Sequence, residues 1–167
     1  MSPTTQSRPL IGVGVVIWRD EQILLGKRPG DLLAKRSSDR DEAVWQFPGG
    51  HLEADESVTG CAAREVKEET GLVVQDFRHL GYTEKTFTVA GKQYVTLLVS
   101  CEYAGGEARV MEPDKCTQWR WFDYRMLPQQ MPGPLFEPIE IFMWQLGASP
   151  GGDLLALHRS SLLICVD

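Results

Sequence analysis

Residues 50–72 read GHLEADESVTGCAAREVKEETGL and constrain the architecture more than any other part of this 167-residue chain. They match the pattern G-x5-E-x7-R-E-U-x-E-E-x-G-U at every position, where U is a bulky apolar residue. The matching residues are Gly50, Glu56, Arg64, Glu65, Val66, Glu68, Glu69, Gly71 and Leu72. This pattern concentrates carboxylates on one helix surface beside a glycine turn, a surface suited to holding a divalent metal ion against a pyrophosphate.

Residues 50–72 contain the clearest helix signal of the chain, over residues 57–70. Asp55 is expected to cap its start, and Glu56 to favour the positive first turn. Gly71 suits the left-handed conformation that ends many helices. Gly60 lowers helix propensity, and we expect another backbone to approach closely there. The stripe expected to face the core consists of Val58, Cys61, Ala62 and Val66.

Glu65, Glu68 and Glu69 are three and four residues apart, so they share one helix face and repel one another. Mg²⁺ or Mn²⁺ between them would relieve the repulsion, because Mg²⁺ prefers carboxylate oxygens together with substrate phosphates. Attack of water on a pyrophosphate places negative charge on phosphate oxygens, which metal ions neutralise, while a nearby carboxylate takes the proton. A solvated acidic helix face would explain REVKEE alone, but the framing glycine, glutamate and arginine favour the catalytic interpretation.

Composition bounds the class of protein. The hydrophobic fraction is 43% and the net charge is −6, as in an ordinary globular domain of this length. An acidic surface disfavours stable binding to duplex nucleic acid, so a phosphate ligand would need metal ions or local basic residues. The four cysteines (Cys61, Cys101, Cys116 and Cys165) are widely spaced and are expected to be reduced thiols. No apolar run reaches 18 residues and the first residues lack a signal-peptide pattern, so we expect a cytoplasmic protein with no membrane span.

The rest of the chain predicts a mixed sheet with helices on both faces. The predicted strands are residues 10–18, 23–28, 44–47, 79–87, 93–103 and 118–122. A second helix is predicted over residues 136–145, and residues 154–166 suit either a helix or a strand. Residues 29–44 are long for a connection and are expected to form a lid or a poorly ordered insert. Trp119 and Trp121 alternate along a strand and are expected to pack in the core or at an interface.

Residues 50–72 resemble the Nudix box, and the chain is similar to Nudix hydrolases over residues 9–146. The strings GVGVVI, LLGKR, WQFPGGHLE, CAAREVKEETGL, YVTLL, EPDKCTQWRWFDYRMLP and PLFEPIE resemble one MutT-like subgroup. That subgroup includes eukaryotic diphosphatases of oxidised and thio-substituted guanine nucleotides and a plant 8-oxo-dGTP and dihydroneopterin triphosphate diphosphatase. The resemblance implies an α/β fold of the Nudix α/β/α sandwich type, Mg²⁺ dependence with Mn²⁺ as a substitute, and a homodimer. It also implies a nucleotide substrate, cleaved to nucleoside monophosphate and pyrophosphate.

The resemblance also implies residue roles. The implied catalytic residues are Arg64, Glu65, Glu68 and Glu69, with Glu65 or Glu68 closest to the role of base. The implied metal ligands are Gly49 through its carbonyl, Glu65, Glu69 and Glu112. The implied substrate-binding residues are Arg28, Gln46, Phe47, Gly50, Thr96 and Phe136. Arg64 is expected to orient a glutamate by ion pairing, and Glu56 to support the junction of loop and helix. The expected organisation is a tail (1–8), a Nudix domain (9–146) and a C-terminal extension (147–167).

Two alternative functions remain. A pyrophosphatase of ADP-ribose or of a nucleotide sugar is less favoured, because the proline typical of that branch is missing from residues 86–96. The SQPWPFPxS string of NADH-type enzymes is also missing. A non-catalytic nucleotide sensor is disfavoured because such proteins usually lose box glutamates, all of which are present here. Glu137 stands where the subgroup often has an aromatic residue, so base preference stays open, as does the phosphorus that water attacks.

Overall fold

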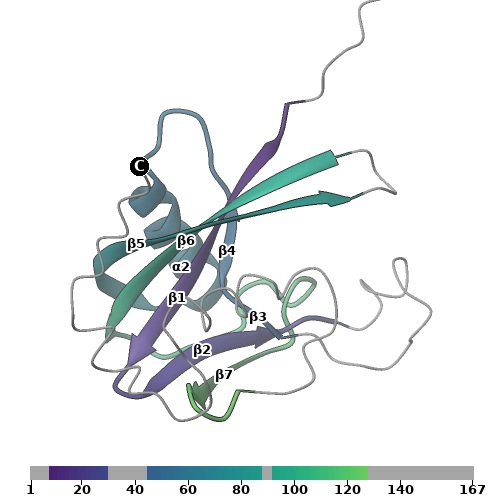
Figure 1. The fold of residues 1–167 in the computed structure, drawn as a ribbon. Coiled ribbons are helices and arrows are strands. Elements are labelled where there is room, and N and C mark those ends of the chain that lie inside the picture. Colours follow the sequence, from purple (N-terminus) through teal and green to yellow (C-terminus); the bar gives the residue numbers. More distant parts are fainter. Residues whose placement is uncertain (1–7, 30–44, 88–91, 128–167) are drawn as a thin grey trace, which may run out of the picture.

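A seven-stranded mixed sheet with one helix against it forms the described part of the protein in the structure, a computed structural model (Figure 1). The described residues are 8–29, 45–87 and 92–127. The strands are β1 (Leu10–Arg19), β2 (Gln22–Lys27), β3 (Trp45–Gln46), β4 (Gly49–His51), β5 (Val73–Phe87), β6 (Lys92–Gly105) and β7 (Gln118–Asp123). The helix is α2 (Val58–Thr70), and it contacts β1, β4, β5 and β6.

Strand β1 organises the sheet. It runs parallel to β6 from Leu10 to Trp18. Its other edge pairs antiparallel with β4 near its start and with β2 at its end. Strand β2 in turn pairs antiparallel with β7, and β6 with β5. Each strand predicted from the sequence therefore has a counterpart in this sheet. The sheet also contains β4, whose two glycines lie beside β1.

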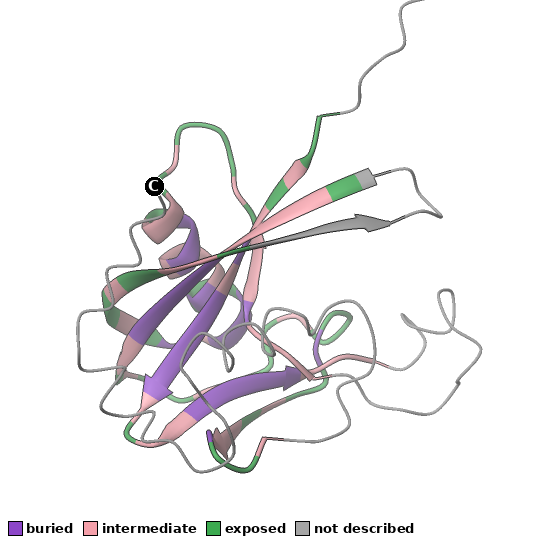
Figure 2. Cartoon of the chain, in the orientation of Figure 1, coloured by how far each residue is buried: buried purple, intermediate pink, exposed green. Residues whose placement is uncertain are grey.

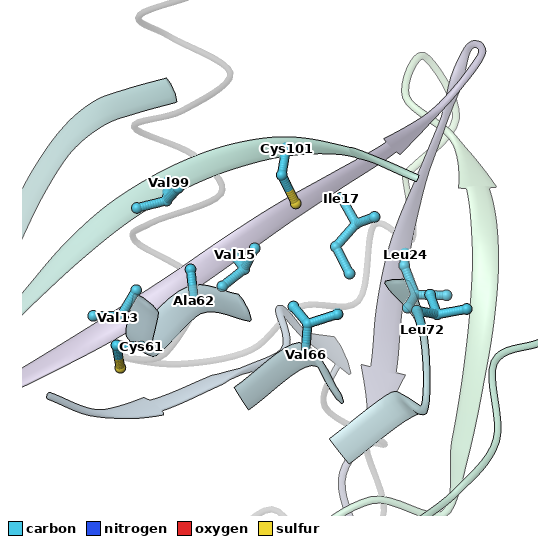
Figure 3. Close-up of a cluster of buried hydrophobic side chains, with 10 residues drawn as sticks. All are labelled: Val13, Val15, Ile17, Leu24, Cys61, Ala62, Val66, Leu72, Val99 and Cys101. Atoms are coloured by element: carbon cyan, nitrogen blue, oxygen red, sulfur yellow. The ribbon is translucent and has the colours of Figure 1, made fainter. Parts of the chain in front are cut away.

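The hydrophobic core lies between the sheet and α2. Alternate residues of β1 point towards the helix, and Val15 and Ile17 are fully buried there. Figure 3 shows how they meet the apolar side of α2 and the neighbouring strands. The cluster consists of Val13, Val15, Ile17, Leu24, Cys61, Ala62, Val66, Leu72, Val99 and Cys101. Burial of one such valine, leucine or isoleucine side chain contributes roughly 1.5–3 kcal/mol to the stability of the fold. Figure 2 shows buried residues along β1, β2, β6 and the side of α2 that faces the sheet.

Helix α2 begins and ends as local chemistry requires, with one correction to the predicted start. Ser57 is the N-cap, and its hydroxyl accepts a hydrogen bond from the Gly60 amide at 3.0 Å. The predicted cap, Asp55, was wrong: it has φ 65° and lies in the turn two residues earlier. Glu56 therefore precedes the cap and does not belong to the first helical turn. Gly71 ends the helix at φ 76° and donates its amide to Lys67 O at 3.0 Å, as predicted.

The apolar stripe predicted for α2 faces the core, whereas the close backbone approach predicted at Gly60 is not found among the described residues. Cys61, Ala62 and Val66 are fully buried, and Val58 packs against their cluster half-buried. A Cβ at Gly60 would lie 3.0 Å from Ser57 Oγ, and no backbone atom of another described segment lies within 4 Å of it. The described part of the chain thus does not make the close backbone approach expected there. This glycine instead leaves room for the serine cap.

One strand was not predicted, and one strand boundary differs from the prediction. The strand predicted over residues 44–47 does end before Pro48-Gly49-Gly50, as β3, but residues 49–51 then form the further strand β4 and pair with residues 12–14 of β1. Glycine permits this pairing, because a Cβ at Gly49 would overlap the carbonyl of Val13 in β1. Strand β5 begins at Val73, earlier than predicted, because register shifts between residues 73 and 81 break the two-residue alternation.

Several predictions lie outside the described residues. These are the helix at 136–145, the segment at 154–166, the tail to residue 7, the insert from residue 30 to residue 44, and the C-terminal extension. In the described ranges, no helix combines the length and apolar character that crossing a membrane requires. Cys61, Cys101 and Cys116 are buried free thiols, as predicted. The tryptophans at 119 and 121 pack against the core, also as predicted.

Candidate active site

The turn at Gly49 and Gly50 brings the backbone against two glutamates of α2. Gly49 has φ 151°, and a side chain there would overlap the carbonyl of Val13. Its amide donates to Glu69 Oε2 at 2.9 Å. A side chain at Gly50 would overlap the carboxylate of Glu65. Both glycines are thus required by close approach, and they place peptide groups directly beside the two carboxylates.

Glu69 is buried in this site, with 7% of its surface exposed. Burial raises its pKa to about 7, and repulsion from the carboxylates of Glu65 and Glu112 contributes to the rise. The hydrogen bond from the Gly49 amide and the positive charge of Lys115 act in the opposite direction. The structure therefore brings Glu112, which is 43 residues after Glu69 in sequence, close enough to Glu69 for the two charges to interact.

A tight turn presents Glu112 to the helix. The amides of Lys115 and Cys116 both donate to Glu112 O at 3.0 Å. Just before it, the Met111 amide donates to Glu69 O at 3.3 Å, which fixes this turn to the end of α2. The ammonium of Lys115 lies 2.8 Å from Glu112 Oε1. Sequence reasoning missed Lys115, although its position three residues after Glu112 in EPDK was the available signal.

Arg64 fixes the outer side of the same carboxylate group. Its guanidinium lies 2.8 Å from Glu56 Oε1, 2.8 Å from Glu65 Oε1 and 3.2 Å from Glu68 Oε2. It also donates to His51 O at 3.2 Å, so it ties the helix to β4. The hydrogen bonds from Arg64 lower the pKa of Glu56 to about 2. The ion pairing expected of Arg64 is present. Glu56 accepts from Arg64 of the helix and from the Glu53 amide of the preceding loop, which fits the expected support of the junction between loop and helix.

The donor set suits a divalent cation. Glu65, Glu69 and Glu112 supply hard carboxylate oxygens, which Mg²⁺ and Mn²⁺ prefer. Their mutual repulsion and the burial of Glu69 are the conditions that a cation would relieve. In the described ranges no three acidic, histidine or cysteine side chains form a ready-made coordination shell. Each carboxylate is instead held by a donor of the chain: Glu65 by Arg64, Glu69 by the Gly49 amide and Glu112 by Lys115.

The residues predicted to bind substrate belong to several strands of the sheet and the segments beside them. Thr96 of β6 pairs with Gly12 of β1, and Gly50 of β4 pairs with Val13 on the other edge of β1. Gln46 pairs with Gly26 of β2, and Arg28 follows the end of β2. Arg28, Gln46, Phe47 and Thr96 are all half-buried. Phe136 lies outside the described residues.

Glu68 differs from the other box glutamates. Its side chain is 55% exposed and pairs with Arg64, whereas that of Glu65 is 12% exposed. The structure therefore places Glu65 and Glu69 inward and Glu68 at the rim. Trp119 was not predicted to belong to the site, yet its indole N–H donates to Glu69 O at 3.1 Å. No local sequence signal connects these two residues, which are 50 positions apart.

Comparison with known proteins shows which sequences the chain resembles. A sequence profile described as the NUDIX domain matches residues 8–142. The NAD-capped RNA hydrolase NudC of Vibrio atlanticus (strain LGP32) is 30% identical over 120 residues, which cover 71% of this chain and 39% of that protein. A MutT-like protein of Streptomyces ambofaciens is 34% identical over 93 residues, or 56% of each protein. This chain thus spans about two fifths of the length of the NudC relative.

A solved structure shows the same fold. The crystal structure of a MutT NUDIX hydrolase from Burkholderia pseudomallei superposes with a TM-score of 0.67 at 31% identity, covering 83% of this chain and 98% of that one. The predicted Nudix α/β/α fold class is thereby confirmed. These relatives are bacterial, and the eukaryotic and plant subgroup stays a prediction. Because the domain profile covers most of its length and a solved member shares its architecture, the chain belongs to the Nudix family.

Proposed function

We propose that this protein is a divalent-metal-dependent hydrolase that cleaves nucleoside triphosphates to nucleoside monophosphate and pyrophosphate. The observation that carries the proposal is the position of Glu65 against Gly50 and of Glu69 on the Gly49 amide, with the charge of Glu112 acting on Glu69. Membership of the Nudix family supports hydrolysis of a phosphorus-containing anhydride. Modified or surplus nucleotides are the proposed substrates, as in the MutT-like proteins that the chain resembles.

Glu65, Glu69, Glu112 and the Gly49 carbonyl would hold the metal ion. When bound, Mg²⁺ or Mn²⁺ neutralises phosphate charge and lowers the pKa of coordinated water. The oxygen of water bonds to phosphorus as the bond from phosphorus to the leaving oxygen breaks, and one proton passes to a glutamate. Glu65 or Glu68 takes that proton. Arg64 contacts both of them, so it sets the orientation of either candidate.

The substrate would approach along the side of the glycine turn. Arg28 supplies positive charge for phosphate at the end of β2. Thr96 pairs with Gly12 of β1, one strand away from the glycine turn, and is proposed to contact the nucleoside part of a substrate whose phosphates face the glutamates. Gln46 and Phe47 lie on the segment that leads into the turn and are proposed to contact the base, together with Phe136.

A second candidate is hydrolysis of a dinucleotide pyrophosphate. The curated relative from Vibrio atlanticus is named for its action on NAD-capped RNA, which favours this possibility. ADP-ribose and nucleotide sugars belong to the same chemical class, because each contains a pyrophosphate between two groups. All of these reactions would use the same carboxylates, so only the substrate distinguishes them. A non-catalytic sensor is the third candidate, and the intact glutamate set argues against it.

A turnover screen tests the proposal. The purified protein is incubated with Mg²⁺ and each of the dNTPs, 8-oxo-dGTP, ADP-ribose, NAD, NAD-capped RNA and diadenosine polyphosphates, and kcat/KM is measured from product chromatography. We expect the highest value for a nucleoside triphosphate, with pyrophosphate as a product. Reaction in ¹⁸O-water then identifies the phosphorus that is attacked, because only one product carries the label.

The variant Glu69→Gln separates an enzyme from a contaminant or a sensor. It should lower kcat by at least about 100-fold, because it removes a charge from the metal site. Glu107→Gln is the matched control: it removes a carboxylate whose described ion partner is the exposed Arg109. No hydrolysis of any anhydride with Mg²⁺ or Mn²⁺ would refute the proposal, and so would full activity in E69Q.

The homodimer and the cytoplasmic location stay predictions. Sedimentation equilibrium of the full chain measures its oligomeric state, with a dimer as the expected result. Fractionation of cells that express the protein tests its location.

A further inference from the structure

Trp119 joins three segments of the site through one backbone oxygen. Its indole N–H donates to Glu69 O at 3.1 Å, and the Met111 amide donates to the same oxygen at 3.3 Å. Trp119 belongs to β7, Glu69 to the last turn of α2, and Met111 immediately precedes Glu112. A single carbonyl group therefore connects two of the proposed metal ligands to a strand on the other side of the helix end.

The direction of this N–H is set by close packing on β2. Trp119 lies opposite Gly26 in the sheet register. A side chain at Gly26 would come within 2.5–2.9 Å of three carbon atoms of the indole ring. The missing Cβ thus lets the ring lie against the strand, two residues before Arg28. The ring also packs against the core cluster, so its position is constrained on several sides.

The end of a helix needs such support, because its last carbonyl groups have no partner within the helix. In α2, Lys67 O accepts from Gly71, Thr70 O accepts from the Arg109 amide at 2.9 Å, and Glu69 O accepts from Met111 and Trp119. Trp119 is the side chain in this set, whereas the other donors are backbone amides that belong to the chain regardless of residue type. Among these donors, the N–H of Trp119 is therefore the one that a substitution can remove.

We infer that Trp119 is a positioning residue of the active site: its N–H holds the last turn of α2 so that Glu69 stays in place relative to Glu112. The inference rests on the proposed function of these glutamates. Displacement of a catalytic group by about 1 Å can lower a rate by 100-fold. Loss of an outer partner of a metal ligand typically lowers metal affinity or activity by about 10- to 100-fold.

Trp119→Phe tests the inference, with Trp121→Phe as its matched control. Both variants make the same chemical change on β7, at half-buried positions two residues apart. Trp121 contacts Arg19, whose guanidinium lies 4.1 Å from its ring centroid, and Tyr103. We expect W119F to weaken Mn²⁺ binding, measured by electron paramagnetic resonance, by about tenfold, and to lower kcat more than it changes KM. W121F should leave Mn²⁺ affinity and kcat within about twofold of the wild-type values.

A second substitution isolates the N–H group. Replacement of Trp119 by 3-benzothienylalanine keeps the bicyclic shape and exchanges the N–H for sulfur, so it should reproduce the loss seen in W119F while preserving the packing on Gly26. Wild-type Mn²⁺ affinity and kcat in this variant would overturn the inference, and so would equal losses in W119F and W121F. Wild-type protein that binds no Mn²⁺ and hydrolyses no anhydride would instead refute the proposed function, so the two failures are distinguishable.

Discussion

The carboxylate of Glu65 occupies the space in which a side chain at Gly50 would begin. The two residues belong to different elements, β4 and α2, and neither could approach the other so closely if residue 50 had a Cβ. Arg64 holds the same carboxylate from the other side, at 2.8 Å. Glu65 is therefore positioned between a peptide backbone and a guanidinium, and its location depends on the absence of one methyl group.

Gly50→Ala should therefore displace Glu65 and lower kcat/KM by about 100-fold. Steady-state kinetics with the best nucleotide from the screen measures this loss. Gly105→Ala is the matched control, because a Cβ at Gly105 would meet no atom of the described residues within 4 Å. Activity in G50A equal to that in G105A would contradict the placement of Glu65 in the catalytic machinery.

The ion pair of Glu56 and Arg64 predicts a specific dependence of stability on pH. Hydrogen bonds from Arg64 lower the pKa of Glu56 from 4.5 to about 2 in the folded protein. A carboxyl group with a lowered pKa stabilises the fold above its unfolded pKa, and this contribution is lost as pH falls from about 4.5 to about 2. Urea unfolding of wild type and Glu56→Gln should differ at pH 7 and converge as pH approaches 2.

Glu53→Gln is the control for that experiment, because its side chain is exposed and only its backbone amide takes part in the Glu56 hydrogen bond. It should follow the wild-type pH dependence throughout. A difference between wild type and E56Q that persists unchanged at pH 2 would show that the ion pair does not stabilise the folded state.

Metal ions should stabilise the folded protein, because a cation relieves repulsion among Glu65, Glu69 and Glu112. At a free metal concentration 100 times the Kd, binding contributes about 2.7 kcal/mol to the free energy of unfolding. For a chain of this size, this corresponds to a rise in Tm of roughly 5–10 °C. Differential scanning calorimetry with Mg²⁺, and after its removal by a chelator, measures the shift.

E69Q should lose most of that Mg²⁺-dependent shift, whereas E107Q should keep it. Equal shifts in the two variants would mean that the ion binds away from Glu69 and acts through general surface charge.

The ion pair between Lys115 and Glu112 should compete with metal binding. The Lys115 ammonium lies 2.8 Å from Glu112 Oε1, and its charge also acts on Glu69. Lys115 is 59% exposed, and exposed ion pairs contribute about 1 kcal/mol or less, which corresponds to about fivefold in affinity. Lys115→Met should therefore tighten Mn²⁺ binding by up to about fivefold, measured by isothermal titration calorimetry.

Arg109→Met provides the comparison, because it removes one positive charge from the same loop at an exposed pair with Glu107. Its Mn²⁺ affinity should equal that of the wild type. If K115M and R109M change the affinity equally, the effect is one of net charge, and the specific contact with Glu112 has no role.

The predictions from sequence were correct for elements whose boundaries depend on one strong local preference of the residues themselves. The β-branched run of β1 and the glycine at the end of α2 each have a single strong physical cause, so β1 and the end of the helix were placed correctly. The predicted N-cap of α2 was wrong because Asp55 and Ser57 are both good caps by residue type. Their backbone conformations, which decided the outcome in favour of Ser57, depend on how the preceding turn packs.

Strand β4 was missed for a different reason. Proline and two glycines usually end a strand, and residues 49–51 offer little side-chain pattern to indicate another. Their pairing with β1 follows from the close approach that Gly49 and Gly50 permit, which is visible only when both strands are in place.

By itself, the sequence determined the chemistry at the centre of this protein. The helix periodicity of residues 57–70 puts Glu65 and Glu69 on one face, and their spacing alone predicts a cation site. The tertiary structure decided what surrounds those glutamates. Glu112, Lys115 and Trp119 reach them because β7 pairs with β2 and the preceding loop bonds to the end of α2. Contacts across some 50 residues of chain depend on strand pairing and close packing, which local sequence patterns do not encode.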